Sequence, residues 1–378
     1  MSQEIYFGYA VHKELASILK KHTPRNIFLV TGKKSFILSG AKKLLGEIIN
    51  KYNNIRFFNF EINPKLKDII KGIDLFNESK CDFIIGVGGG SVIDVAKAIS
   101  VLVKQKANIK EIIKKGILLE SRKIPSVMIP TTAGTGSEST HFSVVYIGKT
   151  KYSLAHNNLI PEYAILDPTF TEKLPGYITA YTGMDGLCQA IESFWSVNST
   201  DESRMYSKKA IKLIMANIIK AVNKPDRIRR ENMLKGSNLS GKAINIAKTT
   251  AAHAISYPIT SYFNVPHGHA VALTLPYFIE FNYDVDPKNL QDKRGIKFVK
   301  NMFNELLGVI GARTPAEARE QFLCIMNNIQ LETNFLKLGI DNNGIEIIIK
   351  NGFSPQRMKN NPKAVSKSDL KKMLRNIQ

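Results

Sequence analysis

A carboxylate and an amide lie four residues apart in the stretch from Tyr181 to Trp195. This spacing places Asp185 and Gln189 on one face of a helix predicted over residues 182–196. Apolar residues at helical spacing predict that the helix is buried: Met184, Leu187, Cys188, Ile191 and Phe194. A buried carboxylate needs a countercharge, and two histidines downstream, His253 and His267, are ordinary metal ligands. We therefore expect a divalent cation among these four side chains. The alternative, an aspartate that caps a helix and two unrelated histidines, stays open.

A glycine-rich stretch from Gly86 to Lys97 follows a predicted strand and opens a predicted helix. Consecutive glycines let the backbone approach a pyrophosphate, and the helix N-terminus offers N–H groups to it. The stretch is neither Gly-x-Gly-x-x-Gly nor the Walker sequence, and a tight turn also uses glycine. A second loop of small and hydroxyl residues, 130–138, follows a neighbouring predicted strand. Two such loops at the carboxyl ends of parallel strands are expected to line one crevice.

Two patterns divide the chain near residue 175. Before it, short β-branched or aromatic runs alternate with helical stretches, which predicts a parallel sheet with helices on both faces. The predicted strands are 27–31, 57–60, 83–86, 126–129, 144–146 and 163–166, with helices over 41–51, 66–79 and 92–103. Beyond it we predict helices alone, including 182–196, 203–222, 228–247, 249–261 and 268–281. We expect a Rossmann-like α/β domain over 1–175, an all-helical domain over 176–378, and a binding cleft between them.

The chain is strongly basic, with a net charge of +21 from 53 Lys and Arg against 32 Asp and Glu. The excess is mostly diffuse lysine, which is typical of a solvated surface but would also favour an anionic substrate or a phosphate-bearing cofactor. No nucleic-acid-binding motif accompanies it, so a non-catalytic protein that binds nucleic acid is a remote alternative.

The cysteines and the hydropathy indicate a cytoplasmic protein. Three widely spaced cysteines, Cys81, Cys188 and Cys324, argue for reduced thiols rather than disulfides. No apolar run approaches the ~20 residues that span a bilayer, and the first residues lack a signal-peptide pattern. We expect no membrane partner, and a homodimer is left open as the assembly.

Taken together, these motifs resemble the iron-containing, or group III, alcohol dehydrogenase family over most of the chain. The segments that carry the resemblance are Phe7-Gly8, Asn63-Pro64, 88–97, 130–138, 165–168, 182–185, His253 and 266–268. The resemblance implies a nucleotide-binding domain, a helical metal-binding domain, and hydride exchange between a nicotinamide cofactor and an alcohol or aldehyde. It implies a metal on Asp185, Gln189, His253 and His267, with Fe²⁺ ahead of Zn²⁺. The cofactor-binding residues it indicates are Gly32, Lys33, Asn63, Gly88, Gly89, Gly90, Ser91, Asp94, Thr131, Thr132, Thr135, Ser137 and Lys151.

Three positions depart from the family pattern. The family usually has histidine where this chain has Gln189, so we expect either a more weakly held metal or a lost metal site. Tyr257 stands where many relatives carry a histidine near the nicotinamide, and its hydroxyl would relay a proton unless it is only a packed core residue. Many members have an aspartate for the adenosine ribose where Gly32 and two lysines occur here, which favours NADPH over NADH.

Within the family, Gln189 and the run 191–204 resemble the subgroup that reduces phosphonoacetaldehyde to 2-hydroxyethylphosphonate. Hydroxyl groups and an arginine suit a phosphonate. The substrate-binding candidates are His141, Lys151, Ser193, Ser196, Asn198, Arg204 and Tyr257, although the serines also fit a helix cap and turn. Other small alcohols, diols or aldehydes are the alternative substrates. A polyol-phosphate dehydrogenase or a dehydroquinate-type cyclase would share the architecture but fits the 130–138 loop less well.

Overall fold

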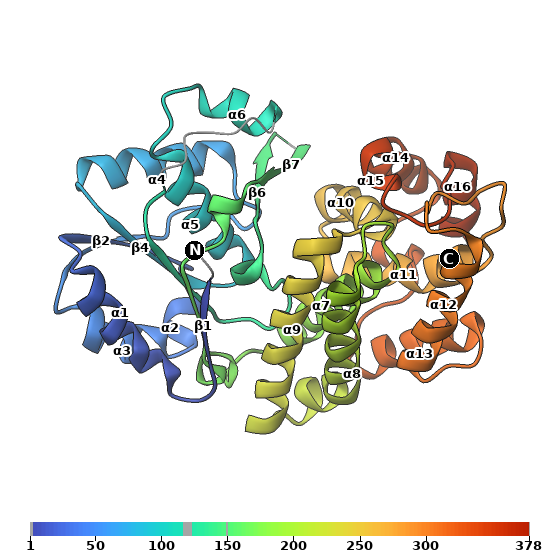
Figure 1. Ribbon diagram of the computed structural model, residues 1–378, viewed down its shortest axis with the longest axis horizontal. Coiled ribbons are helices and arrows are strands. Elements are labelled where there is room, and N and C mark those ends of the chain that lie inside the picture. Colours follow the sequence, from blue (N-terminus) through green and yellow to red (C-terminus); the bar gives the residue numbers. More distant parts are fainter. Residues whose placement is uncertain (1–2, 116–122, 149, 378) are drawn as a thin grey trace. The chain divides into compact units, whose positions relative to one another are not determined.

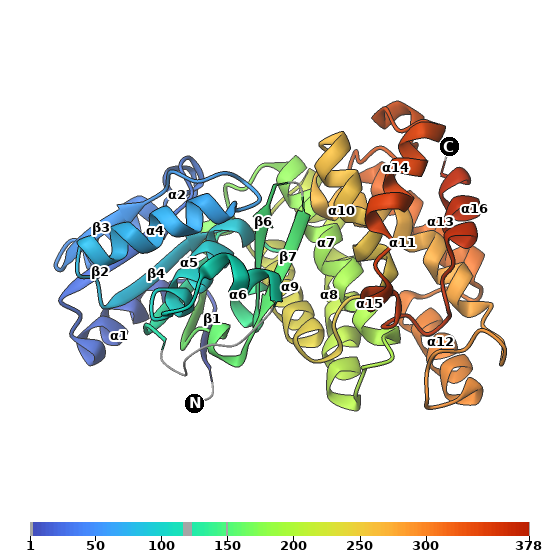
Figure 2. The ribbon, with the colours of Figure 1, turned by 90° about the horizontal axis from the view of Figure 1, so that it is seen from above.

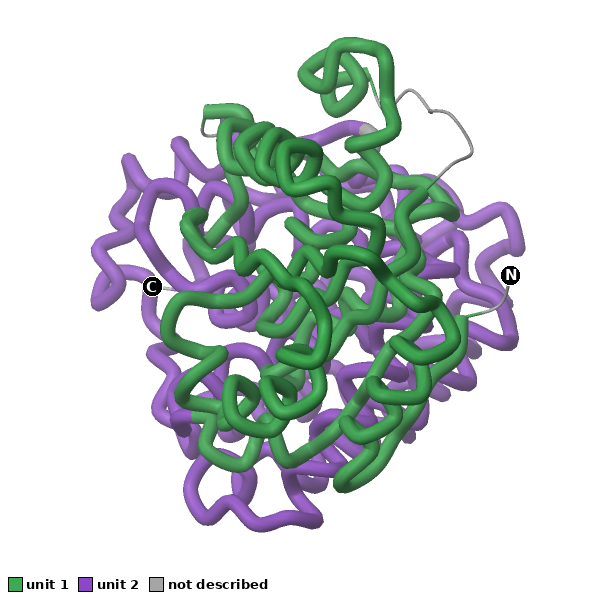
Figure 3. The backbone as a smooth tube through the Cα atoms, turned by 90° about the vertical axis from the view of Figure 1, so that its left-hand side faces the viewer, with its two compact units in different colours: residues 1–174 green, residues 175–378 purple. Residues whose placement is uncertain are grey.

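The computed structural model describes residues 3–115, 123–148 and 150–377. The chain forms two compact units, Met1–Leu174 and Pro175–Gln378 (Figure 3). Each unit contains one kind of architecture, an α/β layer structure in the first and packed helices in the second. The predicted fold class is therefore confirmed.

A six-stranded parallel sheet forms the centre of the first unit. Its strand order is β1-β8-β5-β4-β2-β3. The strands are β1 (Glu4–Phe7), β2 (Asn26–Thr31), β3 (Asn53–Phe57), β4 (Phe83–Gly88), β5 (Ser126–Pro130) and β8 (Tyr163–Leu166). A separate antiparallel hairpin joins β6 (Phe142–Ile147) to β7 (Thr150–Ala155).

Helices cover both faces of this sheet because its inner strands are apolar on both sides. Residues 27, 29, 83, 85, 127 and 129 face one core with α1 (Glu14–His22) and α3 (Ala41–Ile49). Residues 28, 30, 84 and 128 face the other with α4 (Leu66–Glu78), α5 (Gly90–Leu102) and α6 (Ile109–Lys115) (Figure 1). The remaining short elements are α2 (Ser35–Leu38) and the 3-10 turns η1 (Val11–Lys13), η2 (Ser137–Ser139), η3 (Asn157–Leu159) and η4 (Pro168–Thr171).

The strand order places a topological switch point between β2 and β4. The chain runs from β2 outward to β3, then returns to the other side of β2 to form β4 and β5. The loops that follow β2 and β4 therefore diverge, and open α/β sheets bind ligands at the carboxyl ends of such strands.

The second unit is built around α7 (Gly176–Trp195), which is buried over most of its length. It packs against α8 (Asp201–Asn223), α9 (Arg227–Ala247) and α11 (His267–Tyr283), and α10 (Ala251–Phe263) packs on α11 (Figure 2). The other elements are α12 (Ile296–Ile310), α13 (Pro315–Asn328), η5 (Leu336–Leu338), α14 (Asn342–Gly352), α15 (Pro355–Met358) and α16 (Lys367–Arg375). Among the described residues, no helix combines the length and apolar character that a membrane crossing requires.

The structure corrects the strand predicted over residues 57–60. That strand lies earlier, at Asn53–Phe57. Phe58 follows the strand, and its ring centre lies 4.4 Å from the guanidinium carbon of Arg56. The sequence reading also missed β1 and β7. Both are short, and the polar residues of β7 give no clear apolar alternation.

Candidate metal and cofactor sites

Three helices of the second unit bring the predicted metal ligands together. Asp185 lies in the middle of α7, His253 in the first turn of α10, and His267 at the first position of α11. Asp185 Oδ1 is 3.4 Å from His253 Nε2 and 4.0 Å from His267 Nε2, and the three ligand atoms all lie within 4.8 Å of one another. Two ligands of one such ion are separated by about 3 to 3.5 Å, because each bond is about 2.1 Å long. The Asp185–His253 pair lies at this separation and His267 lies slightly farther out, so the cluster could hold a divalent cation.

A glycine permits this close approach of α11 to α7. A Cβ atom at Gly268 would lie 1.9 Å from the carbonyl oxygen of Tyr181 and 2.7 Å from Cβ of Asp185. Any side chain at this position would push the start of α11, and with it His267, away from Asp185.

Hydrogen bonds set both histidine rings with Nε2 toward the cluster. Nδ1 of His253 donates to the carboxylate of Glu192. Ser256 Oγ donates to the carbonyl of His253 at 2.7 Å and lies 3.3 Å from His267 Nδ1, so it accepts from that nitrogen. In the neutral form of each ring the lone pair therefore lies on Nε2, the nitrogen that would bind the metal.

Glu192 organises the start of α10 as well as His253. This fully buried carboxylate accepts hydrogen bonds from the backbone N–H and the hydroxyl of Thr250, at 3.0 and 2.7 Å, and from the backbone N–H of His253 at 3.2 Å. Trp195 Nε1 also donates to the Thr250 hydroxyl, at 3.0 Å. Burial lowers the pKa of His253, but Glu192 and Asp185 outweigh burial and raise it to about 9. A metal must therefore displace a proton from His253 at neutral pH.

Gln189 lies one helical turn after Asp185 and is also buried. Its amide oxygen accepts a hydrogen bond from Ser240 Oγ on α9 at 3.0 Å. An amide oxygen has two lone pairs, so this contact leaves one for a cation. The role of Gln189 as a ligand stays a prediction.

Tyr257 stands beside the cluster with an arginine behind it. Its ring stacks on that of His267, with centroids 5.6 Å apart and planes at 22°. Nη1 of Arg357 donates to its hydroxyl, and the guanidinium lies 4.7 Å from the ring centre. Burial raises the pKa of Tyr257, with Arg357 opposing, so the phenol stays protonated at neutral pH.

In the first unit, the two predicted small-residue loops lie side by side. A Cβ atom at Gly90 would meet Thr135 Cγ2 at 2.7 Å, and one at Gly89 would lie 3.3 Å from Thr132 Cγ2. The backbone N–H of Thr131 donates to the carbonyl of Gly88 at 2.9 Å. The glycines open α5, whose N-terminal N–H groups suit a pyrophosphate. The buried hydroxyl of Thr131 makes no hydrogen bond within the described part of the chain, so this cradle retains an unused polar atom for a ligand.

Other predicted cofactor residues gather around the same helix. The backbone N–H of Asn63 lies 3.4 Å from Ser91 Oγ. Asp94 accepts from Ser137 Oγ at 2.6 Å, and burial raises the pKa of Asp94 while Lys97 and Lys151 oppose the increase. These residues support one another around the start of α5.

Lys97, which the sequence reading left without a role, fastens the second loop to α5. Its fully buried ammonium donates to the carbonyls of Ser137 and Thr140 at 2.7 and 2.8 Å, and also to the carbonyl of Phe142. The lysine thereby fixes the loop against the helix that carries the glycines.

The turn after β2 carries a glycine where a side chain would require Ser35 to move. A Cβ atom at Gly32 would lie 2.1 Å from Ser35 Oγ. Arg56 reaches this turn from β3: its Nε donates to Thr31 Oγ1 at 2.8 Å and its Nη2 to the carbonyl of Gly32 at 3.2 Å. Within the described chain no carboxylate lies within 4.0 Å of Arg56, so the turn is positively charged together with exposed Lys33 and Lys34.

The residues predicted to bind the substrate do not form one cluster as the metal ligands do. Ser193 Oγ donates to the Ala190 carbonyl at 3.0 Å, and Ser196 Oγ donates to the Ala247 carbonyl at 2.6 Å. Both serines are fully buried, and both hydroxyls take part in helix packing. His141 stacks on Phe142 in the first unit, and Asn198 donates to Asn360.

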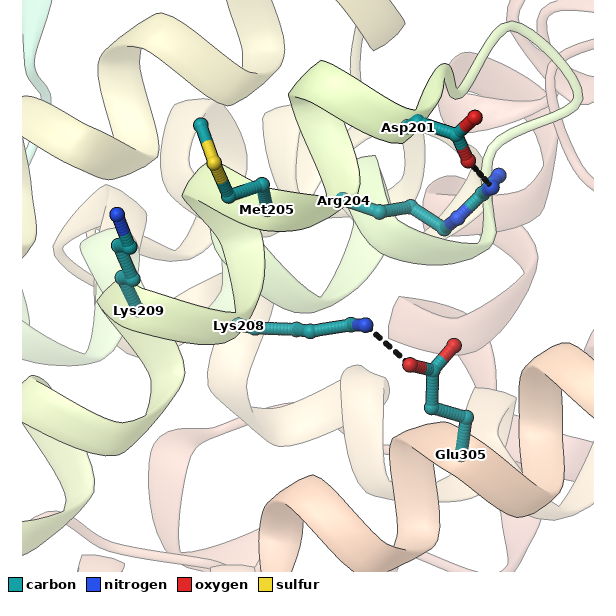
Figure 4. A pocket seen from close by; sticks show the side chains of 6 residues that line it. All are labelled: Asp201, Arg204, Met205, Lys208, Lys209 and Glu305. Carbon is teal, nitrogen blue, oxygen red and sulfur yellow. Dashed lines mark hydrogen bonds and ion pairs between the residues drawn. The ribbon is translucent and has the colours of Figure 1, made fainter.

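Arg204 borders a surface pocket of about 420 Å³ that shares no residue with the metal cluster. The lining residues are Asp201, Arg204, Met205, Lys208, Lys209 and Glu305. Figure 4 shows Arg204 turned to Asp201 and Lys208 turned to Glu305, with an ion pair in each case. Two of the pocket's three cations are therefore neutralised by its own carboxylates.

Sequence reasoning missed Glu192, Arg357, Lys97 and Arg56. Glu192 gave a usable signal, since it lies seven residues after Asp185 in an otherwise apolar helix. The other three depend on contacts between segments far apart in the chain, and no local pattern marks them.

Comparison with known proteins agrees with this geometry. Residues 2–168 match the family described as iron-containing alcohol dehydrogenase, and residues 179–378 match the C-terminal region of the same family. The chain is 31% identical over 361 residues to the long-chain-alcohol dehydrogenase 1 of Geobacillus thermodenitrificans, covering 93% of this chain and 89% of the relative.

Two sulfoacetaldehyde reductases are also similar. That of Bilophila wadsworthia is 28% identical over 389 residues, covering 98% of this chain and 96% of the relative. The crystal structure of that from Bifidobacterium kashiwanohense, in complex with NAD⁺, has a TM-score of 0.88 at 29% identity, covering 99% of this chain and 96% of that one.

Proposed function

The chain belongs to the iron-containing alcohol dehydrogenase family and is an NAD(P)-dependent oxidoreductase; from this we propose that it reduces phosphonoacetaldehyde to 2-hydroxyethylphosphonate. The observation that carries the proposal is the cluster of Asp185, His253 and His267, with the cation of Arg357 one aromatic ring away. The similarity to two sulfoacetaldehyde reductases supports an anionic two-carbon aldehyde. Sulfonate and phosphonate are both tetrahedral oxyanions, so a site for one suits the other.

Asp185, His253, His267 and Gln189 would hold the metal, Fe²⁺ before Zn²⁺, as the nitrogen and oxygen donors suggest. When bound, the cation supplies Lewis-acid polarisation of the aldehyde oxygen and the reduced nicotinamide supplies the hydride. Glu192 and Ser256 hold the two imidazoles in the tautomer that this arrangement requires.

Tyr257 is the residue we propose for proton transfer to the product oxygen. Its hydroxyl accepts a hydrogen bond from Arg357 and therefore directs its own proton elsewhere. Because burial raises the pKa of Tyr257, the proton is retained at neutral pH until a stronger base forms next to it. Water or a cofactor ribose hydroxyl are the alternative donors.

The paired glycine loops would hold the cofactor pyrophosphate, and the turn after β2 favours NADPH. Gly32 supplies no ribose-binding carboxylate, and Lys33, Lys34 and Arg56 together suit the 2′-phosphate. Purified enzyme should show a lower KM for NADPH than for NADH. A lower KM for NADH would refute this preference.

The second candidate is an enzyme for a neutral alcohol, diol or aldehyde. The similar protein of Geobacillus thermodenitrificans is a long-chain-alcohol dehydrogenase, which favours this candidate. The two candidates differ in the charge of the substrate.

A substrate panel tests the proposal. Metal-reconstituted enzyme is assayed by NADPH oxidation with phosphonoacetaldehyde, sulfoacetaldehyde, lactaldehyde and propionaldehyde. We expect kcat/KM for the phosphonate to exceed that for either neutral aldehyde by at least about tenfold, the value of one charge-assisted hydrogen bond. Equal or higher kcat/KM with the neutral aldehydes would overturn the phosphonate assignment and leave the family assignment intact.

A further inference from the structure

Arg357 is a cation beside Tyr257 that no acidic residue neutralises among residues 3–115, 123–148 and 150–377. It belongs to α15, near the end of the chain, and reaches Tyr257 on α10. The Tyr257 ring contacts both groups: its centre lies 4.7 Å from the guanidinium carbon of Arg357 and 5.6 Å from the centre of the His267 imidazole. Segments almost a hundred residues apart thus place a positive charge one ring away from the predicted metal.

The hydrogen bonds of Arg357 leave most of its donors unused. Nη1 donates to the Tyr257 hydroxyl, and within the described residues no carboxylate lies within 4.0 Å of the guanidinium. Several other arginines of the same unit are neutralised; for example, Arg294 pairs with Asp292 at 2.6 Å, and Arg319 pairs with Glu280 at 2.9 Å. A partly buried guanidinium with unused N–H groups is a binding site for an oxyanion.

We propose that Arg357 binds the anionic group of the substrate and so determines the preference for a phosphonate or sulfonate aldehyde. Such a substrate has its carbonyl two carbons from the oxyanion, which matches a cation close to, but not within, the metal cluster. The contact with the Tyr257 ring and the hydrogen bond to its hydroxyl hold the guanidinium in place, and its remaining N–H groups can bind an oxyanion. The inference rests on the proposed function and names the residue that recognises its substrate.

The test compares Arg357→Met and Arg357→Lys with wild type on phosphonoacetaldehyde and propionaldehyde. Arg357→Met should raise KM for the phosphonate at least about tenfold more than KM for propionaldehyde. Because Arg357 also donates to the Tyr257 hydroxyl, kcat should fall to a similar degree for both aldehydes. Arg357→Lys should recover only part of the loss, because an ammonium is a point charge without the paired donors. The exposed Arg313→Met removes the same charge elsewhere and should behave as wild type.

Calorimetric titration with ethylphosphonate, which cannot react, gives a second measurement. Wild type should bind it, and Arg357→Met should weaken binding by the same factor as KM. An equal rise in KM for the phosphonate and the neutral aldehyde would mean that Arg357 acts only through Tyr257 and the packing of α15 on α10, and would overturn the inference.

The remaining outcomes separate this inference from the proposed function. If wild type prefers phosphonoacetaldehyde and Arg357→Met keeps that preference, the inference fails alone. The inference also fails alone if Arg204→Met, at the surface pocket, selectively raises KM for the phosphonate and Arg357→Met does not. If wild type prefers neutral aldehydes, both the proposed function and the inference are overturned.

Discussion

At the scale of single residues, Glu192 shows how a carboxylate outside the ligand set controls a metal site. It fixes the tautomer of His253 and caps α10 through Thr250, so its loss should leave the ligands in place but poorly oriented. We predict that Glu192→Gln lowers metal affinity by about 10- to 100-fold. Competition between the metal-loaded protein and a chelator measures this. The surface substitution Glu202→Gln is the control, and equal affinities would show that His253 needs no partner.

Gln189 is the residue at which this site departs from its family. Gln189→His should tighten metal binding by about tenfold, because imidazole is a better donor than an amide oxygen and Ser240 can accept from its other nitrogen. The rate of metal loss to a chelator measures the change. Unchanged loss would exclude position 189 from the ligand set.

The sequence predicted the ligand types because metal chemistry restricts them to a few residues. Asp185, His253 and His267 were predicted from their identity and local pattern together with the family resemblance, and the structure brings them together. Arg357 was not predicted, because its role depends on a contact with Tyr257, a hundred residues away in the sequence. The hydroxyls of Ser193 and Ser196, which looked suitable for a phosphonate, donate to backbone carbonyls in the helix packing.

At the scale of elements, Lys97 joins α5 to the loop that follows β5. Burial lowers its pKa to about 8 from the ordinary 10.5, with Asp94 and Glu138 opposing. Between these values the unfolded chain holds a proton that the folded protein has lost. Stability from this group is therefore lowest below about pH 8 and rises with pH up to about 10.5, by at most about 1.4 kcal/mol per pH unit.

Lys97→Met should remove this rise. Urea unfolding at pH 7.5 and 9.5 measures it as the difference between the two free energies of unfolding. The exposed Lys104→Met should keep the wild-type difference. If Lys97→Met also keeps it, the lysine does not titrate in this range.

The elements themselves were predictable where burial imposed a strong pattern. The inner strands β2, β4 and β5 are apolar on both faces, and α4, α5 and α7 to α11 have long helical repeats. The strand β3 was displaced because Phe58 and Phe60 look like strand residues but pack beside it on Arg56 and Phe57. The hairpin strand β7 needs β6 as a partner and has little apolar character of its own.

At the scale of the whole molecule, the net charge of +21 bears on how substrate arrives. A basic surface attracts an anion over distances comparable with the Debye length, about 10 Å at 0.1 M salt. The attraction acts on encounter, whereas Arg357 acts on the bound substrate. The two effects are separable because salt screens the long-range field much more than a partly buried contact.

We predict that kcat/KM for phosphonoacetaldehyde falls by at least about threefold as sodium chloride rises from about 20 to 300 mM. Under the same conditions kcat/KM for propionaldehyde should change little, since a neutral molecule does not respond to the field. Chloride is used because sulfate or phosphate would compete at Arg357. Arg357→Met should retain the salt dependence at its lower activity, because removing one charge leaves most of the +21 in place. The same fall for both aldehydes would trace the salt effect to the cofactor or the fold, and the basic surface would then have no part in selecting the substrate.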